Sequence, residues 1–229
     1  MRTEIASADT LKGLTEIDKA DVRSSFFSRF DEKGIREDSL AEHHADITRI
    51  ELSSTVPAGV VVQFETAKNL YLYAWYVYRF YPVAAHQVLT CLELGLRERI
   101  GGSLPPKYLR RPNDVPTMRP LLRCAIDRGL IRNEEFRQWR EHVQRRAENR
   151  YRDEQVAALV ETGLESCELR YENAVPNEQD KDFDYLAILK EVLPDIRNSL
   201  AHGSTHLSNQ VLGTFELVQE ILNQLYRPS

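Results

Sequence analysis

The spacing of apolar residues close to the end of the chain is the feature that most restricts its fold. Apolar side chains recur there three and then four residues apart, as in a helix packed against a partner, at Leu186, Leu189, Leu193, Ile196 and Leu200. Gly203 is expected to end this helix, because glycine adopts the left-handed C-terminal conformation without steric cost. Pro194 lies inside the stripe and predicts a kink, because the stripe keeps its phase there; a new helix that begins at Pro194 is the alternative.

Similar patterns elsewhere predict an all-α helical bundle. Residues 66–99 predict two long helical segments that meet at a kink at Pro82, and residues 118–130 predict a shorter helix. A further helix is expected after Asn133, but its middle, residues 144–155, is polar on nearly every side. That part is therefore expected to project from the core or to bridge to another surface.

Length and composition limit the number of domains. The chain has 229 residues, of which 42% are apolar, enough for one substantial core. Residues 1–58 are polar and weakly periodic, so they predict a separate N-terminal segment with short helices, followed by a helical domain at residues 59–229. Proline and glycine beside a β-branched run predict a short extended segment near residues 60–64.

Several classes of protein are disfavoured. The most apolar stretch, residues 70–78, is far shorter than the ~20 residues that span a bilayer, so no membrane partner is expected. The three cysteines are far apart and suggest neither a disulfide framework nor a zinc site, which fits a protein of the reducing cytoplasm. No metal site and no cofactor are expected, because ligands at metal spacing and a phosphate-cradling glycine loop are missing.

Charge is distributed unevenly along the chain. The formal net charge is -5, yet residues 97–152 contain 15 Lys or Arg against 7 Asp or Glu. A locally basic face on an acidic protein allows RNA contact at chosen places rather than everywhere. The alternative for any single arginine there is a solvated helix surface with ion pairs.

Polar residues at the end of the first stripe form a candidate site. At about 100° per residue, Asn198 and His202 fall roughly 40° apart and nearly opposite the apolar stripe, with Arg197 on the flank. Arginine offers a planar fork of donors that matches phosphate, and histidine transfers protons near neutral pH. The combination predicts a ribonuclease site. A structural alternative is that the three side chains cap carbonyls or bond a neighbouring loop.

This arrangement resembles the HEPN superfamily of small helical domains. The family motif is an arginine, usually followed by a polar residue, with a histidine four to six residues beyond, and Arg197, Asn198 and His202 match it. The resemblance covers roughly residues 66–229. It implies metal-independent RNA cleavage in toxin-antitoxin systems or in abortive infection, an antiviral defence. It also implies a homodimer whose motifs face each other, with an antitoxin or another defence protein as a possible partner.

RNA cleavage of this kind is chemically reasonable without a metal, because RNA carries its own nucleophile, the 2′-hydroxyl. His202 would act as general acid or base, Arg197 as phosphate clamp and Asn198 as the orienting residue. The expected product carries a 2′,3′-cyclic phosphate. The alternative is a non-catalytic helical module that binds a nucleotide or a protein partner through the same surface.

Two further pairs are candidates for site-adjacent residues. Arg79 and His86 also satisfy the loose arginine-to-histidine spacing, but an aromatic residue follows the arginine and a proline interrupts the interval. A kinked helix with two satisfied polar side chains explains them equally well. Glu93 and Arg97 are spaced for a helical ion pair, which is their default interpretation. They could instead line a cleft opposite His202.

Overall fold

The computed structural model describes residues 5–32, 34–109, 111, 114–163, 165–203 and 207–228. This part of the chain is mainly helical, which confirms the predicted all-α class. The α-helices are α1 (Leu40–Thr48), α2 (Ala58–Tyr73), α3 (Phe80–Ile100), α4 (Met118–Asp127), α5 (Arg137–Thr162), α6 (Tyr185–Ala201) and α7 (Leu212–Leu225). A small antiparallel hairpin joins β1 (Ser28–Asp31) to β2 (Gly34–Glu37).

Short 3-10 turns connect these elements. They are η1 (Ser7–Asp9), η2 (Leu14–Glu16), η3 (Val22–Phe26), η4 (Gly101–Ser103), η5 (Pro106–Tyr108), η6 (Asn133–Glu135) and η7 (Tyr171–Asn173).

Helix α2 replaces the extended segment that was expected near residues 60–64. That prediction is wrong, because Val60, Phe64, Ala67 and Tyr71 are buried at helical spacing and belong to one continuous helix. Its β-branched residues carry only a small helix penalty, which burial of this face outweighs.

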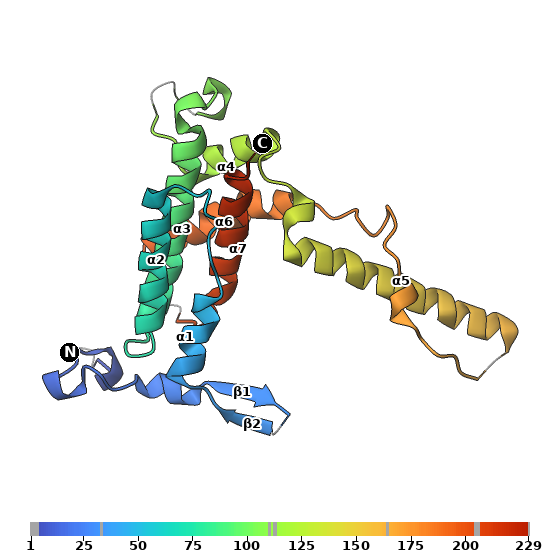
Figure 1. The fold of residues 1–229 in the computed structure, drawn as a ribbon, viewed down its shortest axis with the longest axis horizontal. Helices are drawn as coiled ribbons and strands as arrows, with labels where there is room; N and C mark the ends of the chain where they lie inside the picture. Colours follow the sequence, from blue (N-terminus) through green and yellow to red (C-terminus); the bar gives the residue numbers. More distant parts are fainter. Residues whose placement is uncertain are drawn as a thin grey trace.

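The chain reverses between α2 and α3, so that the two helices lie side by side (Figure 1). The predicted kink at Pro82 is therefore wrong, since residues 74–79 form the turn and Pro82 lies in the first turn of α3. A proline is tolerated there because the N–H groups of a first turn have no partner within the helix.

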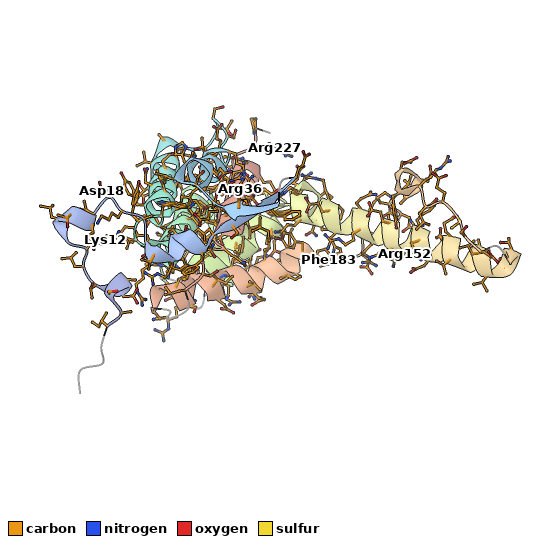
Figure 2. All side chains as sticks on the ribbon, turned by 90° about the horizontal axis from the view of Figure 1, so that it is seen from below. Lys12, Asp18, Arg36, Arg152, Phe183 and Arg227 are labelled. Atoms are coloured by element: carbon orange, nitrogen blue, oxygen red, sulfur yellow. The ribbon has the colours of Figure 1, made fainter. Side chains whose placement is uncertain are left out.

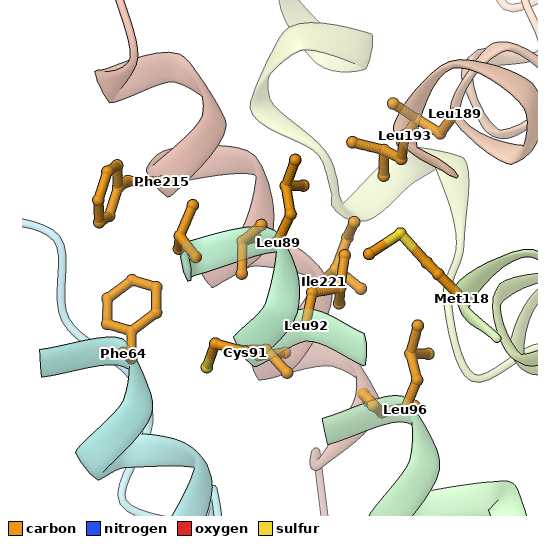
Figure 3. Packing of buried hydrophobic residues seen from close by; sticks show 14 of the residues in the cluster. Phe64, Leu89, Cys91, Leu92, Leu96, Met118, Leu189, Leu193, Phe215 and Ile221 are labelled. Atoms are coloured by element: carbon orange, nitrogen blue, oxygen red, sulfur yellow. The ribbon is translucent and has the colours of Figure 1, made fainter. Parts of the chain in front are cut away.

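Helix α3 is the centre of the hydrophobic core. It packs against α2, α4, α6 and α7, and its Leu89, Leu92 and Leu96 are fully buried. Figure 3 shows Phe64 of α2 facing Phe215 of α7, with their ring centroids 6.0 Å apart. Leu189 and Leu193 of α6 approach the same core beside Met118 of α4 (Figure 3). The core thus places one face of α6 against α3.

Gly95 allows α3 and α7 to approach closely. A Cβ atom at Gly95 would lie 2.5 Å from Cδ2 of Leu222, which is itself fully buried and has little room to move. Gly95→Ala is therefore expected to lower the free energy of unfolding by about 1 to 3 kcal/mol, the usual cost of overpacking. Urea denaturation followed by circular dichroism measures this change.

Gly59→Ala is the matched control, because its Cβ would meet the nearest atom at an ordinary 3.6 Å. Alanine also favours the helix over glycine, so this variant should keep or raise the stability. Equal stability of the two variants would contradict the close approach at Gly95.

The N-terminal segment is more structured than short helices alone. The hairpin was not predicted, and it is joined to α1 by the ion pair from Arg29 to Asp46, while Arg29 also pairs with Asp38 (2.6 Å), which lies between the hairpin and α1. Ile47 and Val56 are buried in the same core as the residues that follow position 58. The described part of this segment therefore contributes residues of α1 and of the turn after it to the bundle.

Helix α5 extends away from the bundle, as Figures 1 and 2 show from two directions. Trp139 and Val143, in its first half, belong to the hydrophobic core, and no residue of 144–155 does, which confirms that this part projects from the core. The returning chain is held to the helix by Arg150, whose guanidinium lies 2.9 Å from the Asp180 carboxylate. None of the helices in the described ranges is long and apolar enough to cross a membrane.

Candidate functional site

Helix α6 carries the predicted motif without interruption. It runs through Pro194, which excludes the alternative that a new helix begins there. His202 is its C-terminal cap, and Gly203 follows with φ of 84°, the left-handed conformation expected of it. The motif therefore occupies the last turn and a half of a helix that is anchored in the core by Leu186, Leu189 and Leu193.

Arg197, and not Ile196, continues the inward face of α6. Ile196 is 43% exposed, so its predicted place in the buried stripe is wrong. With 3.6 residues per turn, the position of α6 that faces the core after Leu193 falls between residues 196 and 197, so either side chain could turn inward. The acceptor that favours Arg197 is Glu93 of α3, whose Oε2 lies 3.1 Å from an Arg197 terminal nitrogen.

Glu93 binds two arginines at once. Its carboxylate is almost fully buried, and its Oε1 accepts a hydrogen bond from Arg97 at 2.7 Å while Oε2 faces Arg197. The predicted helical pair of Glu93 and Arg97 is thus present, and the same carboxylate also reaches the motif. A buried carboxylate is stable only when it is paired in this way. Glu93 therefore fixes the position of the Arg197 guanidinium.

His86 lies on the same side of α3, two helical turns before Glu93. Burial and the positive charge of Arg197 both lower the pKa of His86, which keeps its imidazole neutral near pH 7. The Nε2 atom of His86 and the Nε atom of Arg197 are both buried and have no hydrogen-bond partner among the described residues. The prediction that His86 lies beside the site is consistent with this geometry.

Arg79 does not belong to this cluster. Its guanidinium makes a bidentate contact with Asp9, at 2.7 and 2.8 Å, and so ties the N-terminal segment to the start of α3. Hydrogen bonds from Arg79 and then Arg23 lower the pKa of Asp9 to about 2. The arginine of the second motif thus has a structural partner, and only its histidine lies near Arg197.

A cleft of about 680 Å³ opens beside Arg197, between α6, α4 and the loop that precedes α4. We call it the arginine cleft. It is lined by Glu93, Lys107, Tyr108, Leu109, Asp114, Val115, Thr117, Met118, Arg119, Pro120, Arg123, Pro194, Arg197 and Asn198. Four of these side chains are cationic and two are anionic, so the lining carries a net positive charge.

The cations of the arginine cleft differ in how they are neutralised. Arg119 and Arg123 share the exposed Glu191 of α6, and Arg119 also lies 2.7 Å from Asp195. Lys107 has no carboxylate within ion-pair distance in the described part of the chain, and its Nζ lies 4.9 Å from the centroid of the Tyr108 ring. The cleft thus offers an ammonium group that no carboxylate of the described residues neutralises, and two arginines on exposed, exchangeable ion pairs.

Sequence reasoning did not single out Lys107, Arg119 or Arg123. The signal that could have found them is the basic surplus of residues 97–152, within which all three lie. The surplus indicated a region of the chain but not which side chains the fold brings to Arg197.

Asn198 and His202 both lie on the exposed side of α6, as predicted. Asn198 lines the arginine cleft, whereas His202 is not among the lining residues and lies one helical turn beyond it. The backbone N–H of His202 donates to the Asn198 carbonyl at 3.0 Å, which places the two residues in register at the helix end. A single chain therefore combines Glu93, Arg197 and Asn198 in one cleft and leaves His202 facing outward.

The candidate site consists of nitrogen donors around a single buried carboxylate. Within the described ranges, no group of three or more His, Cys, Asp or Glu side chains could hold a metal ion. Comparison of the chain with models of protein families, with curated proteins and with solved structures finds no match in any of the three.

Proposed function

We propose that the protein is a metal-independent endoribonuclease of the HEPN type, with RNA as its substrate. The observation that carries the proposal is that a buried carboxylate orients the motif arginine at the wall of a cationic cleft. A phosphodiester that enters the arginine cleft would meet Arg197, Asn198 and Lys107 together. Cationic clefts concentrate polyanions, and arginine matches the oxygens of phosphate.

Each residue of the motif has a distinct part in the proposed reaction. Glu93 engages one terminal nitrogen of Arg197, and a guanidinium has five N–H donors, so further donors are left for a phosphate. Asn198 would hold a non-bridging oxygen or orient the imidazole. His202 would take the proton of the 2′-hydroxyl or supply one to the leaving 5′-oxygen.

We propose that the active form is a homodimer in which the motifs face each other. His202 faces outward in one chain, so a second copy could bring its own His202 to the arginine cleft of the first. Helix α6 also presents an exposed apolar stripe made of Ile188, Val192 and Ile196, at spacing that a partner helix could cover. A two-fold contact along this stripe would bring the two motifs together.

The biological setting follows from the resemblance alone. It suggests a cytoplasmic toxin or an antiviral abortive-infection protein, held in check by an antitoxin or another defence protein.

The proposal predicts that purified protein cuts a labelled structured RNA in the presence of EDTA. The 2′-hydroxyl is the nucleophile, so the 5′ fragment should end in a 2′,3′-cyclic phosphate, which acid converts to a 2′- or 3′-monophosphate. Gel electrophoresis before and after acid treatment detects this shift. Fragments with 5′-phosphate ends, or cutting that EDTA abolishes, would contradict the mechanism. Binding of RNA without any cutting would favour the non-catalytic module instead.

A further inference from the structure

Lys107 differs from the other cations that line the arginine cleft. Arg197 is paired with Glu93, and the two arginines of α4 share Glu191. Lys107 has no carboxylate within ion-pair distance among the described residues. An anion that enters the cleft therefore meets the charge of Lys107 without having to displace a carboxylate from it.

The two carboxylates of the lining are engaged elsewhere. Glu93 holds its two arginines, as described above. Asp114 accepts a hydrogen bond from the Arg111 backbone N–H at 3.2 Å, and its own backbone N–H donates to the Arg111 carbonyl at 3.2 Å. Asp114 is therefore bonded to its own loop, and within the described ranges neither carboxylate forms an ion pair with Lys107.

The Tyr108 ring supports the ammonium group of Lys107. The Lys107 Nζ atom lies 4.9 Å from the centroid of this ring, which is within the range of a cation–π interaction. The ring is partly buried against the hydrophobic core, and its hydroxyl donates to the Asp127 carboxylate of α4 at 2.8 Å. A lysine side chain is long and flexible, so this support reduces the conformational entropy that Lys107 would lose on binding a ligand.

The segment that carries Lys107 is fixed to the end of α4 at two points. One is the hydrogen bond of Tyr108 to α4. At the other, Arg128 donates to the hydroxyl oxygen of Ser103 at 2.9 Å and also to its carbonyl oxygen. The prolines at positions 105 and 106 restrict the backbone between these points. Lys107 therefore lies on a well-anchored wall of the cleft.

Lys107 and Arg197 belong to different walls of the cleft, the loop before α4 and helix α6. The cleft volume of about 680 Å³ is in the range of sites that hold drug-sized molecules, so it exceeds what one phosphate group would fill. Arginine matches a single phosphate with a fork of donors, whereas lysine acts as a point charge without a fixed geometry. These properties suit Arg197 to the reacting phosphate and Lys107 to a neighbouring phosphate of the same strand.

We infer that Lys107 binds an RNA phosphate next to the one that is cleaved, and that Tyr108 is the positioning residue that holds its ammonium group in place. The inference rests on the proposed function, since it requires that RNA enters the arginine cleft. It assigns Lys107 to the binding of the substrate and leaves the reaction itself to Arg197 and the other residues of the motif.

Binding of a fluorescent single-stranded 2′-O-methyl RNA to the full chain, measured by anisotropy in EDTA at several salt concentrations, tests the inference. This probe lacks the 2′-hydroxyl nucleophile, so binding is measured without cleavage. Lys107→Met should weaken binding about tenfold and reduce the slope of log K against log salt by about 0.7 to 1, the effect of one lost phosphate contact. Lys107→Arg should keep the slope of the wild type. Lys181→Met, at an exposed position outside the cleft, is the matched control and should change neither quantity.

A double-mutant cycle tests the role of Tyr108. Tyr108→Leu removes the ring beneath the ammonium group and should weaken binding of the same probe. In a protein that already carries Lys107→Met, the change should have little further effect, because the ring acts through the lysine. Additive losses would show that Tyr108 does not position Lys107.

Steady-state cleavage of unmodified RNA separates this inference from the proposed function. Lys107→Met should act mainly by raising KM, whereas Arg197→Ala should act mainly on kcat. If the wild type cuts RNA but Lys107→Met leaves the salt slope unchanged or lowers only kcat, the inference is overturned and the ribonuclease proposal stands. Lys107-dependent binding without any cutting would refute the ribonuclease and support Lys107 as a phosphate-binding residue. A wild-type protein that binds no RNA would overturn the inference.

Discussion

Replacing His202 with alanine is expected to slow RNA cleavage by about 10³-fold, since a positioned acid or base contributes 10²- to 10⁴-fold. Arg197→Ala should cause a loss of similar size, because the phosphate then loses the donor fork that Glu93 orients. His202 is exposed and makes no side-chain hydrogen bond within the described ranges, so its replacement should leave the thermal stability unchanged. Initial rates on a labelled RNA measure both effects.

Control substitutions and mixtures of the two inactive proteins test whether the loss of activity comes from the proposed site. His44→Ala and Arg152→Ala remove exposed residues of the same types far from the cleft, and both should retain full activity. If the site is shared between two copies, mixing the inactive Arg197→Ala and His202→Ala proteins should restore part of the activity. Full activity of His202→Ala would refute its catalytic role. Inactive mixtures that demonstrably exchange subunits would refute the shared site.

Glu93→Ala is expected to cause the second large effect, a loss of about 2 to 3 kcal/mol in the free energy of unfolding. Removing one partner of a buried ion pair typically costs 3 to 5 kcal/mol. Arg97 and Arg197 are 44% and 30% exposed, so water compensates part of that cost. Chemical denaturation measures the loss, and RNA cleavage should fall as well because Arg197 is no longer held.

Two control variants test whether the loss of stability comes from the ion pairs of Glu93. One replaces another glutamate of α3, and the other makes a conservative change at position 93. Glu98→Ala removes an exposed carboxylate with no ion pair in the described part of the chain, so it should change stability by less than about 0.5 kcal/mol. Glu93→Gln keeps an oxygen for one arginine and should fall between the wild type and Glu93→Ala. A Glu93→Ala protein as stable as the wild type would show that Glu93 does not hold the two arginines.

Local patterns were sufficient for most of the helices. The leucine spacing in residues 186–193 and the polar middle of α5 each reflect how one helix meets the core, which periodicity records directly. The hairpin at residues 28–37 escaped because its apolar pair, Phe30 and Ile35, points to solvent while its arginines bind the acidic side of α1. A strand is predicted from apolar residues that alternate toward a core, and here the apolar side of the hairpin faces solvent.

The candidate site was predictable only in part, for a related reason. Arg197, Asn198 and His202 are recognisable because they follow one another on a single helix. The choice between Ile196 and Arg197 for the inward position depends on Glu93, which is more than a hundred residues away in the chain. Lys107 and Arg119 line the same cleft only because α4 and the loop before it pack against α6. Such contacts between distant segments leave no periodic trace.

The projecting helix α5 has a consequence for how the chain can vary. The start of α5 is joined to the chain that returns to α6, because Nε1 of Trp139 donates to the Phe183 carbonyl at 2.8 Å, so the bundle is closed without the distal part of α5. Residues 148–163 and 165–173 contain no buried residue, so this excursion is an insertion whose length and composition are free of the core's packing requirements. Changes in the length or charge of this excursion would change the reach of the molecule and leave the packing around the arginine cleft as it is.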